Sequence, residues 1–438
     1  MTDPQADPGA RWRTPEMAAR VRQRNNAERR FRRLGAAAIG SAVAILALLL
    51  GSIVYNGYGA FWTTEIRVDI HFDPEAIAPI EGLTRTEREE ALSRTDFAAL
   101  IRNGLRREFP DVRSRGDIRQ LQSLVSAGAR QQLRNLLVDQ PELRGRTTPL
   151  WLPADDEVDR LGKDPSTRKT PEAGRRLSDA QISWIDSLAA KDRIRTTFNR
   201  RFFTSGDSRE PELAGILGAT IGSLLTLIVT LGLVFPLGVS TAIYLEEFAP
   251  ENRWTDLIEI NINNLAAVPS IVFGLLGLAL FLNTMGLPRS APLVGGATLG
   301  LMTLPTVIIV GRAAIKAVPP SIREAARGLG ASPLQVVFHH VLPLAMPGIL
   351  TGTIISMARA LGETAPLLMI GMVAFVVDLP DDFTSAATAL PVQIFLWADS
   401  PERAFVEKTS GAILVLLVFL VLMNAVAIAL RQKLEKRW

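Results

Sequence analysis

Two oppositely charged side chains stand inside one long apolar stretch of the sequence. Arg359 and Glu363 lie four residues apart in the run Ala-Arg-Ala-Leu-Gly-Glu-Thr-Ala-Pro. On a continuous helix that spacing places both on one face, where they can pair. A charge at mid-membrane costs about 2.5–3.5 kcal/mol on insertion scales, so such a pair marks a polar route more often than a link between helices. The guanidinium fork suits a tetrahedral oxyanion, and the carboxylate offsets its charge so that the anion can leave.

A second stretch carries helix caps and turn residues rather than charges in an apolar run. Ser321 followed by Glu324 predicts a capping box, and Gly328 or Gly330 can end that helix in a left-handed turn. Ser332, which is followed by proline, predicts the start of a second helix. The sequence therefore predicts a short helix–turn–helix that a partner protein could bind, although Glu324 can also be only a cap.

The charged residues are distributed unevenly along the chain, and this distribution indicates which segments lie in a membrane and which are soluble. The chain has 438 residues, of which 48% are hydrophobic, and 92 charged residues with a net charge of +4. Residues 57–212 hold 26 basic and 26 acidic residues, whereas residues 34–56 hold none. This pattern indicates a membrane protein with a charged soluble insert and excludes a purely soluble globular enzyme.

A bilayer core requires about 20 mostly apolar residues per helix. Six segments qualify, at residues 34–55, 214–243, 258–282, 293–310, 348–376 and 412–430. The first follows nine arginines and ends beside Tyr55, Tyr58 and Trp62, which favours an uncleaved anchor with interfacial aromatic residues over a secretory signal.

Orientation follows from the position of the basic residues. The segment 1–33 has nine arginines against four acids, which predicts a cytoplasmic N-terminus. Counting crossings places the insert 57–212 outside, and the loop 318–343 and the C-terminus inside. Five domains are expected, namely a basic segment (1–33), a first transmembrane helix (34–56), a periplasmic insert (57–212), a five-helix core (213–432) and a basic tail (433–438). Since the basic excess lies beside a span, no nucleic-acid partner is expected.

The acidic loop with Glu246, Glu247 and Glu251 fits its inside placement poorly. Acids carry little weight in setting orientation. The six-span topology is therefore kept.

The insert 57–212 has the patterns of a small α+β domain. Ile66, Val68 and Ile70 alternate with polar residues over 65–72, as in a half-buried strand. Helices are predicted around residues 97–105 and after Ser178, which forms a capping box with Gln181. The polar segment 145–176 reads as a loop. A spacer or docking domain is the plainest interpretation, and a sensing role is the alternative.

Several chemistries are disfavoured by composition. The chain has no cysteine, which excludes disulfides, cysteine-ligated zinc and iron–sulfur clusters. It has three histidines, so no metal site is predicted. An enzyme acting through the insert is disfavoured because we find no nucleophile–base set there.

The loop between the fourth and fifth spans resembles the EAA loop of ABC importer permeases. The residues that carry the resemblance are Glu324, Ala325, Ala326, Gly330, Leu342 and Pro343. The resemblance implies that this loop docks into a groove of an ATPase and transmits its closure. His340 departs from the pattern, which has an apolar residue there.

Three further segments, at residues 268–274, 362–368 and 390–394, resemble the permeases of phosphate ABC importers, the PstA family. The resemblance covers residues 213–438 and the first span. It implies an all-α polytopic membrane protein with six transmembrane helices, the MetI-like fold of type I ABC importers, to which the small α+β extracytoplasmic insert is added. A basic residue expected in the fourth span of some relatives is absent near Ile309, and Arg312 stands three residues on. The implied anion path therefore rests on Arg359 and Glu363.

The implied function is that of a permease subunit, in the bacterial inner membrane, that imports inorganic phosphate. The sequence has no phosphate-binding P-loop, so ATP and magnesium would be bound by a partner and this chain would hold no cofactor. The implied partners are an ABC ATPase dimer, a second permease similar to PstC, and an extracytoplasmic phosphate-binding protein. The alternatives are a permease for another oxyanion or small solute, and a membrane-anchored sensor with an extracytoplasmic ligand domain.

Overall fold

The computed structural model describes residues 15–163, 168, 170–373 and 375–434. The chain divides into two compact units, residues 1–55 and 56–438. Helix α1 (Pro15–Gly57) contains the predicted first span, and all but its last two residues belong to the first unit. Residues 1–14 of the basic N-terminal segment and 435–438 of the basic tail lie outside the described residues.

The second unit begins with the insert, which is built on a three-stranded antiparallel sheet of order β2-β1-β3. The central strand β1 (Trp62–His71) pairs with β2 (Thr147–Pro153) and β3 (Ile194–Phe198). Its alternating Ile66, Val68 and Ile70 are buried in the main core of the insert, which confirms the predicted strand.

Short helices accompany this sheet in the insert. They are η2 (Tyr58–Phe61), α2 (Arg85–Ala91), η3 (Leu92–Arg94), α3 (Phe97–Glu108), α4 (Arg115–Gln122), α5 (Ala129–Asp139), η4 (Pro141–Leu143), α6 (Asp156–Lys163), η6 (Glu172–Gly174), α7 (Asp179–Ala190) and α8 (Arg200–Thr204). Two of them, η2 and α8, pack against permease helices. The predicted helix at 97–105 is α3, and Ser178 and Gln181 form the predicted capping box of α7.

The prediction of a loop over 145–176 was wrong for two elements, β2 and α6. Pro149 obscured the strand, because proline cannot donate to a sheet ladder and is tolerated only at an edge, which is where β2 lies. Helix α6 buries only Val158 and Leu161 among polar residues, so its apolar pattern is short.

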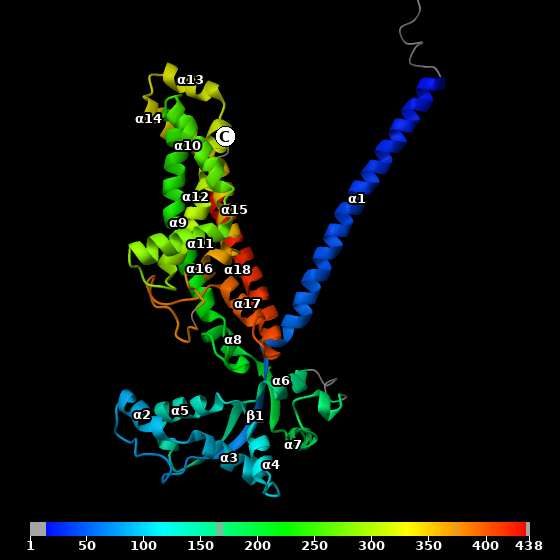
Figure 1. Cartoon of the computed structure of the whole chain (residues 1–438), viewed down its shortest axis with the longest axis vertical. Coiled ribbons are helices and arrows are strands. Elements are labelled where there is room, and N and C mark those ends of the chain that lie inside the picture. Colours follow the sequence, from blue (N-terminus) through cyan, green and yellow to red (C-terminus); the bar gives the residue numbers. More distant parts are fainter. Residues whose placement is uncertain (1–14, 164–167, 169, 374, 435–438) are drawn as a thin grey trace, which may run out of the picture. The chain divides into compact units, whose positions relative to one another are not determined.

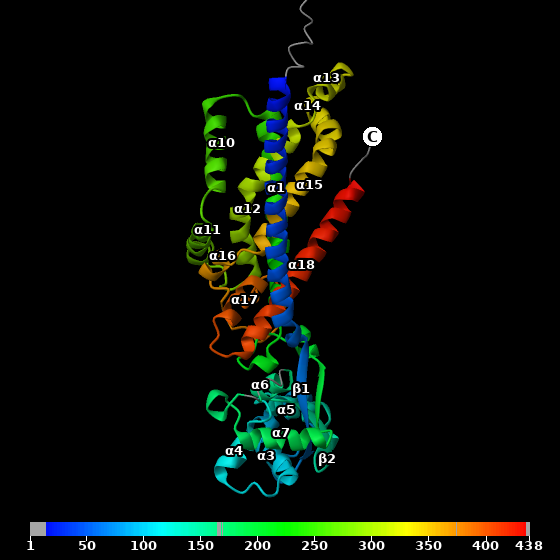
Figure 2. The ribbon, with the colours of Figure 1, turned by 90° about the vertical axis from the view of Figure 1, so that its right-hand side faces the viewer.

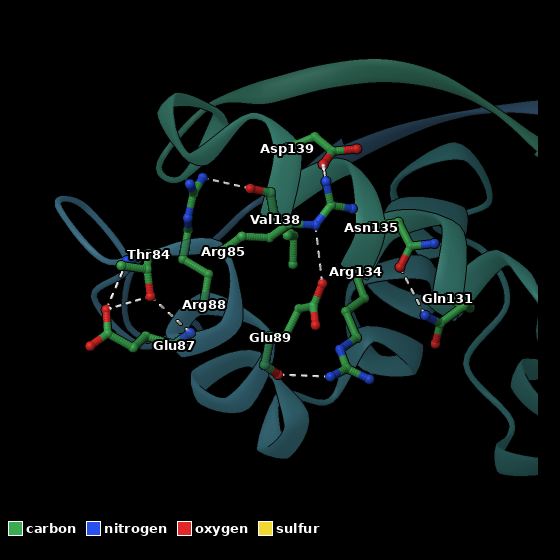
Figure 3. Close-up of polar contacts among 10 residues, drawn as sticks. All are labelled: Thr84, Arg85, Glu87, Arg88, Glu89, Gln131, Arg134, Asn135, Val138 and Asp139. Carbon is green, nitrogen blue, oxygen red and sulfur yellow. Dashed lines mark hydrogen bonds and ion pairs between the residues drawn. The ribbon is translucent and has the colours of Figure 1, made fainter.

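Polar contacts join α2 to α5 on the insert (Figure 3). Arg85 pairs with both Glu89 and Asp139, at 3.3 Å in each case. Arg88 donates to the carbonyl of Val138 at 2.5 Å, and Arg134 donates to the carbonyl of Glu89 at 2.7 Å. The two Arg85 pairs are exposed and each contributes little, so the apolar core beneath them supplies most of the stability.

The permease part is helical. A short turn η7 (Pro211–Leu213) leads into α9 (Leu217–Ile243), η8 (Tyr244–Phe248), α10 (Arg253–Ala266), α11 (Ser270–Gly277), η9 (Leu278–Thr284), α12 (Pro292–Lys316), α13 (Pro320–Gly328), α14 (Pro333–Gln335), η10 (Val336–Val341), α15 (Leu342–Leu361), α16 (Ala365–Met369), α17 (Leu390–Ala398) and α18 (Ala404–Leu434). Across both units, five helices of the described chain are long and apolar enough to cross a membrane, or six if one bent pair is a single span.

The bent pair is a correction to the predicted third span, 258–282. Helices α10 and α11 meet at an angle of 102°, so this segment is not one straight helix. Pro269 lies at the break, where it lacks an N–H and disfavours helical backbone at Val268. Figure 1 shows α11 turned across the direction of α10, and Figure 2 shows α11 nearly end-on beside α16.

The predicted fifth span, 348–376, was also wrong in its extent. Helix α15 ends at Leu361, and the short helix α16 follows Thr364. Pro366 lies in the first turn of α16, where backbone N–H groups have no partner within the helix, so the missing N–H of proline costs nothing there. In the middle of a continuous helix the same proline would remove a hydrogen bond. The chain therefore breaks just after Arg359.

Glycines allow α12 to lie close to both α9 and α15. A Cβ on Gly296 would meet the carbonyl oxygen of Thr226 at 2.6 Å, and one on Gly352 would overlap the side chain of Val310. Small residues of this kind let membrane helices approach closely. Helix α12 is consequently the central element on which α9 and α15 pack.

Candidate functional site

The structure places Arg359 in the last turn of α15 and Glu363 just beyond it. Arg359 Nε lies 3.5 Å from Glu363 Oε1. The Arg359 side chain is 63% exposed and that of Glu363 is 20% exposed. The expectation that both lie on one continuous helix face was wrong, because the helix ends between them. The pair is long for a hydrogen bond, so most of the donors of Arg359 are available.

A narrow cleft begins at Arg359. Its walls come from α10, α11, α12 and α15 and the turn between α10 and α11, and it measures only about 10 Å³, about enough for one water molecule. Thr303, Thr306 and Ser356 supply its hydroxyl groups. The hydroxyls of Thr303 and Ser356 donate to carbonyls of their own helices, Leu299 and Gly352. In this arrangement the guanidinium is the stronger donor facing the cleft.

A wider groove of about 490 Å³ adjoins this cleft, since Thr306 and Ser356 line both. It is bounded mainly by α12 and α15, and Arg431 of α18 lies on its wall. Arg431 Nη1 donates to Thr351 Oγ1 at 3.0 Å. The two spaces thus connect Arg359 and Arg431 along a strip of hydroxyl groups, and the groove, unlike the narrow cleft, has room for a hydrated anion.

The helix predicted around Ser321 exists as α13, but its predicted capping box does not form. The N-cap position is Pro319 and makes no side-chain cap hydrogen bond. Proline at position 320 already has the φ angle of a first helical residue, so the helix begins before Ser321 and places Glu324 outside a capping position. The cap predicted at Ser332 does form, with Gln335.

Arg323 fixes α13 to two other helices, a role that the sequence analysis missed. Its Nη2 lies 2.7 Å from Glu247 Oε1, at the end of the α9 segment. The same guanidinium donates to the carbonyls of Ile315 and Val318, at 2.9 and 2.6 Å. It therefore donates to carbonyl groups in the last turn of α12 and in the turn that follows it. This geometry couples any movement of α13 to α9 and α12.

The same contacts explain the acidic loop that fitted the topology poorly. Glu247 balances Arg323, and Glu246 lies 3.4 Å from Arg312. Arg312 also pairs with Glu259 at 2.7 Å. With two carboxylates against it, Arg312 is poorly suited to bind an anion. The unusual placement of Glu246 and Glu247 was the signal that could have revealed these pairs.

The loop residues named from the EAA pattern divide into an inner and an outer set. Ala326 is buried in the core between α9, α12 and α15, whereas Glu324 and Ala325 are exposed. Gly330 has φ +88°, which favours glycine, and follows α13 as the predicted left-handed turn. Leu342 and Pro343 begin α15 and are half-buried.

Large apolar side chains are exposed beside Glu324. Leu329 is 90% exposed, Leu334 is 60% exposed and Phe338 is 50% exposed. We refer to Glu324, Leu329, Leu334 and Phe338 as the coupling surface.

The departure of His340 from the EAA pattern has a local explanation. A π-helical turn, η10, adds one residue here, so that Val341 is buried and His340 is exposed.

The insert is joined to the permease helices by buried contacts. Lys163 Nζ of α6 lies 2.6 Å from Asp159 and 2.7 Å from Glu407 of α18. Burial alone would lower the pKa of Lys163, but the two carboxylates outweigh it and raise the pKa. Phe202 of α8 packs in one cluster with Trp397 and other side chains of α17 and α18. We refer to these contacts as the insert junction.

Two family models match the sequence. Residues 234–438 match a family described as "Binding-protein-dependent transport system inner membrane component". Residues 18–172 match a family described as "Domain of unknown function (DUF3333)". Residues 173–233 lie between the two matches and include Phe202 of the insert junction.

Similar proteins include permeases of phosphate transport systems. The phosphate transport system permease protein PstA 1 of Mycobacterium tuberculosis is 35% identical over 217 residues, which cover 50% of this chain and 70% of that protein. The phosphate transport system permease protein PstA of Pasteurella multocida is 30% identical over 221 residues, 49% of this chain and 76% of that protein. The match with an inward-facing structure of the MetNI methionine ABC transporter covers 50% of this chain and 98% of the chain in that structure, with 16% sequence identity and a TM-score of 0.41.

Proposed function

Because the chain belongs to the PstA family of binding-protein-dependent transport permeases, we propose that it carries inorganic phosphate across the inner membrane. It is a permease subunit of an ABC importer, and several of its helices are long and apolar enough to span a membrane. The observation that carries the proposed cargo is the 35% identity over 217 residues to a phosphate transport permease.

In the proposed path, Arg359 meets the phosphate. Its guanidinium lines the cleft beside α12, and Glu363 is its only ion-pair partner among the described residues. A bidentate contact from an arginine fits the oxygens of phosphate. Glu363, at 3.5 Å, competes with the anion for the same donors. Competition of this kind keeps binding weak enough for release.

The coupling surface is the proposed contact with an ABC ATPase dimer. Exposed apolar side chains beside a carboxylate are typical of a protein interface. Nucleotide-driven movement of α13 would reach α9 and α12 through the contacts of Arg323. Since α12 also packs on α15, the movement would reach the helix that carries Arg359.

The proposed topology has six spans, with α10 as one arm of a bent span and the continuous segment of α11 and η9 as its other arm. Nine arginines in residues 1–33 support a topology with the N-terminus and the coupling surface in the cytoplasm and the insert in the periplasm. A second permease similar to PstC and a periplasmic phosphate-binding protein would complete the importer.

The test is to purify the intact complex from membranes and to identify its subunits by mass spectrometry. Its ATPase activity is then measured in proteoliposomes with phosphate, sulfate or an amino acid, each presented with the co-purified binding protein. The proposal expects an ATPase, a second permease and stimulation by phosphate. Stimulation by sulfate or an amino acid alone would reassign the cargo, and absence of an ATPase would contradict the coupling proposal.

A further inference from the structure

A second arginine-lined pocket lies at the base of the insert, away from the cleft at Arg359. It measures about 580 Å³. Its walls come from all three strands, α8 and the turn η7, and include Thr63, Glu65, Arg195, Arg200, Arg201 and Glu212. Neither the proposed transport path nor the coupling surface uses any of these residues.

Two of the three arginines that line the pocket form no ion pair within 4 Å among the residues that the structure describes. Arg195 is occupied, since its Nε and Nη2 lie 2.9 and 2.7 Å from Glu65 Oε2 and its guanidinium lies over the ring of Trp151 at 4.1 Å. Arg200 and Arg201 form no ion pair with any residue in the described part of the chain. The pocket therefore has positive charge that the protein itself does not balance.

The second carboxylate of the pocket, that of Glu212, does little to balance this positive charge. Glu212 is only 7% exposed and accepts a hydrogen bond from the hydroxyl of Ser126. Burial raises the pKa of Glu212 to about 7, so it is partly neutral near neutral pH. Burial also lowers the pKa of Arg201, against the attraction of Glu65 and Glu212. An anion placed beside Arg201 would relieve this cost.

The pocket lies close to the membrane boundary along the chain. The first candidate span ends at Phe61 and the next begins at Leu217, whereas the pocket is lined by residues that start at Thr63 and end at Glu212. Tyr58 and Trp62 pack together with ring centroids 6.1 Å apart. These are the aromatic residue types that gather at the level of lipid headgroups.

We propose that this pocket binds a phosphate group through the guanidinium groups of Arg200 and Arg201, both of which line it. The group is that of an anionic phospholipid headgroup or of free inorganic phosphate, and the nearby membrane boundary favours the headgroup. The guanidinium fork matches phosphate oxygens, and Thr63 and Ser205, which also line the pocket, carry hydroxyl groups that can add contacts. This inference does not depend on phosphate being the transported solute.

The experiment compares the full-length protein with R200A/R201A. A matched control, R106A/R107A, removes two adjacent exposed arginines of α3 that do not line the pocket. All three are made in an Arg359→Ala background, so that the proposed transport path contributes no phosphate binding. Native mass spectrometry from nanodiscs measures retained phosphatidylglycerol against phosphatidylcholine, and tryptophan fluorescence in detergent measures binding of inorganic phosphate.

The proposal expects R200A/R201A to bind phosphatidylglycerol, inorganic phosphate or both about tenfold more weakly, and the control to bind normally. A loss in the lipid arm alone identifies a headgroup site, and a loss in the phosphate arm alone identifies a site for the free anion. Equal binding by R200A/R201A and the parent in both arms overturns the proposal, as does absence of binding by the parent. If R200A/R201A does not fold, Arg200→Glu at the exposed position gives the same test.

Discussion

The two ends of the permease bundle are built in opposite ways. At the insert junction the apolar residues Phe202, Trp397 and Phe405 are buried against one another, and Lys163 is held between two carboxylates. At the coupling surface the apolar residues Leu329, Leu334 and Phe338 are exposed. There, charged contacts fix only the inner side of α13.

This difference indicates which contacts the chain completes by itself. The junction buries its apolar surface within one chain, so the insert and the helices around α18 are joined before any partner binds. The coupling surface leaves its apolar side chains in water, which is costly unless another protein covers them. Altering the coupling surface should therefore affect activity, whereas altering the junction should affect stability.

The largest expected effect is on coupling. Glu324→Arg places a positive charge in the coupling surface and should reduce ATP-driven phosphate uptake to background, because like or unpaired charges in an interface cost several kcal/mol. Glu324 is exposed, so insertion into the membrane should be unchanged. Uptake and ATPase activity in vesicles measure this. The control Glu251→Arg alters another exposed glutamate, in the turn before α10, and should retain uptake. Normal uptake by Glu324→Arg would remove the docking proposal.

The next effect is on the attachment of α13. Arg323→Ala leaves the carboxylate of Glu247, whose side chain is 7% exposed, without its partner. We expect the local stability of α13 to fall by about 3 kcal/mol, which is typical when one partner of a buried ion pair is removed. Hydrogen exchange of α13 measures it. The control Arg327→Ala removes an exposed arginine of the same helix, and its α13 should exchange hydrogen as slowly as α13 of the parent protein. Unchanged exchange in Arg323→Ala would show that α13 is held by other contacts.

A smaller effect is expected at the junction. Lys163→Met leaves Asp159 and Glu407 facing each other and should weaken the attachment of α6 by about 1–2 kcal/mol. A double-mutant cycle with Glu407→Gln, followed by limited proteolysis of residues 204–216, measures the coupling. Lys191→Met, which breaks a pair with Glu108 elsewhere on the insert, is the matched control. Additive effects of the two junction substitutions would contradict a direct ion pair.

The smallest effect concerns pH. Burial raises the pKa of Glu212 from 4.5 to about 7. Between these values the folded state binds more protons than the unfolded state, so stability falls as pH rises through this window. Between pH 6 and pH 8 we expect the local free energy of unfolding around η7 to fall by about 1 kcal/mol. Hydrogen exchange, corrected for its intrinsic rates, measures it. Glu212→Gln should remove most of this dependence, and Glu172→Gln, at an exposed position, should not.

The sequence predicted the elements whose apolar pattern is long or whose caps are local. Strand β1 follows from Ile66, Val68 and Ile70, and the capping boxes at Ser178 and Ser332 follow from their own neighbours. The sequence did not predict where a long apolar run breaks. The breaks fall next to Pro269 and Pro366, which are visible in the sequence, but hydropathy contains no information on how α11 packs against α16, where Gly274 lies against Pro366.

The candidate site was predictable in its residues but not in its contacts. Arg359 could be found because a charge in an apolar run is unusual. The role of Arg323 could not, because its partners Glu247 and Ile315 belong to separate helices that meet only in the fold. The same holds for Lys163 and Glu407, which are 244 residues apart in the sequence.

The most direct test of phosphate transport by this chain is the uptake of radiolabelled phosphate by vesicles with the Arg359→Ala protein. Arg289→Ala, which removes an exposed arginine with no ion pair among the described residues, is the matched control. The loss of a charge-assisted bidentate contact should slow uptake by about 10- to 100-fold while ATP hydrolysis continues, and the control should take up phosphate normally. Uptake by Arg359→Ala at the rate of the control would contradict a phosphate path at this arginine.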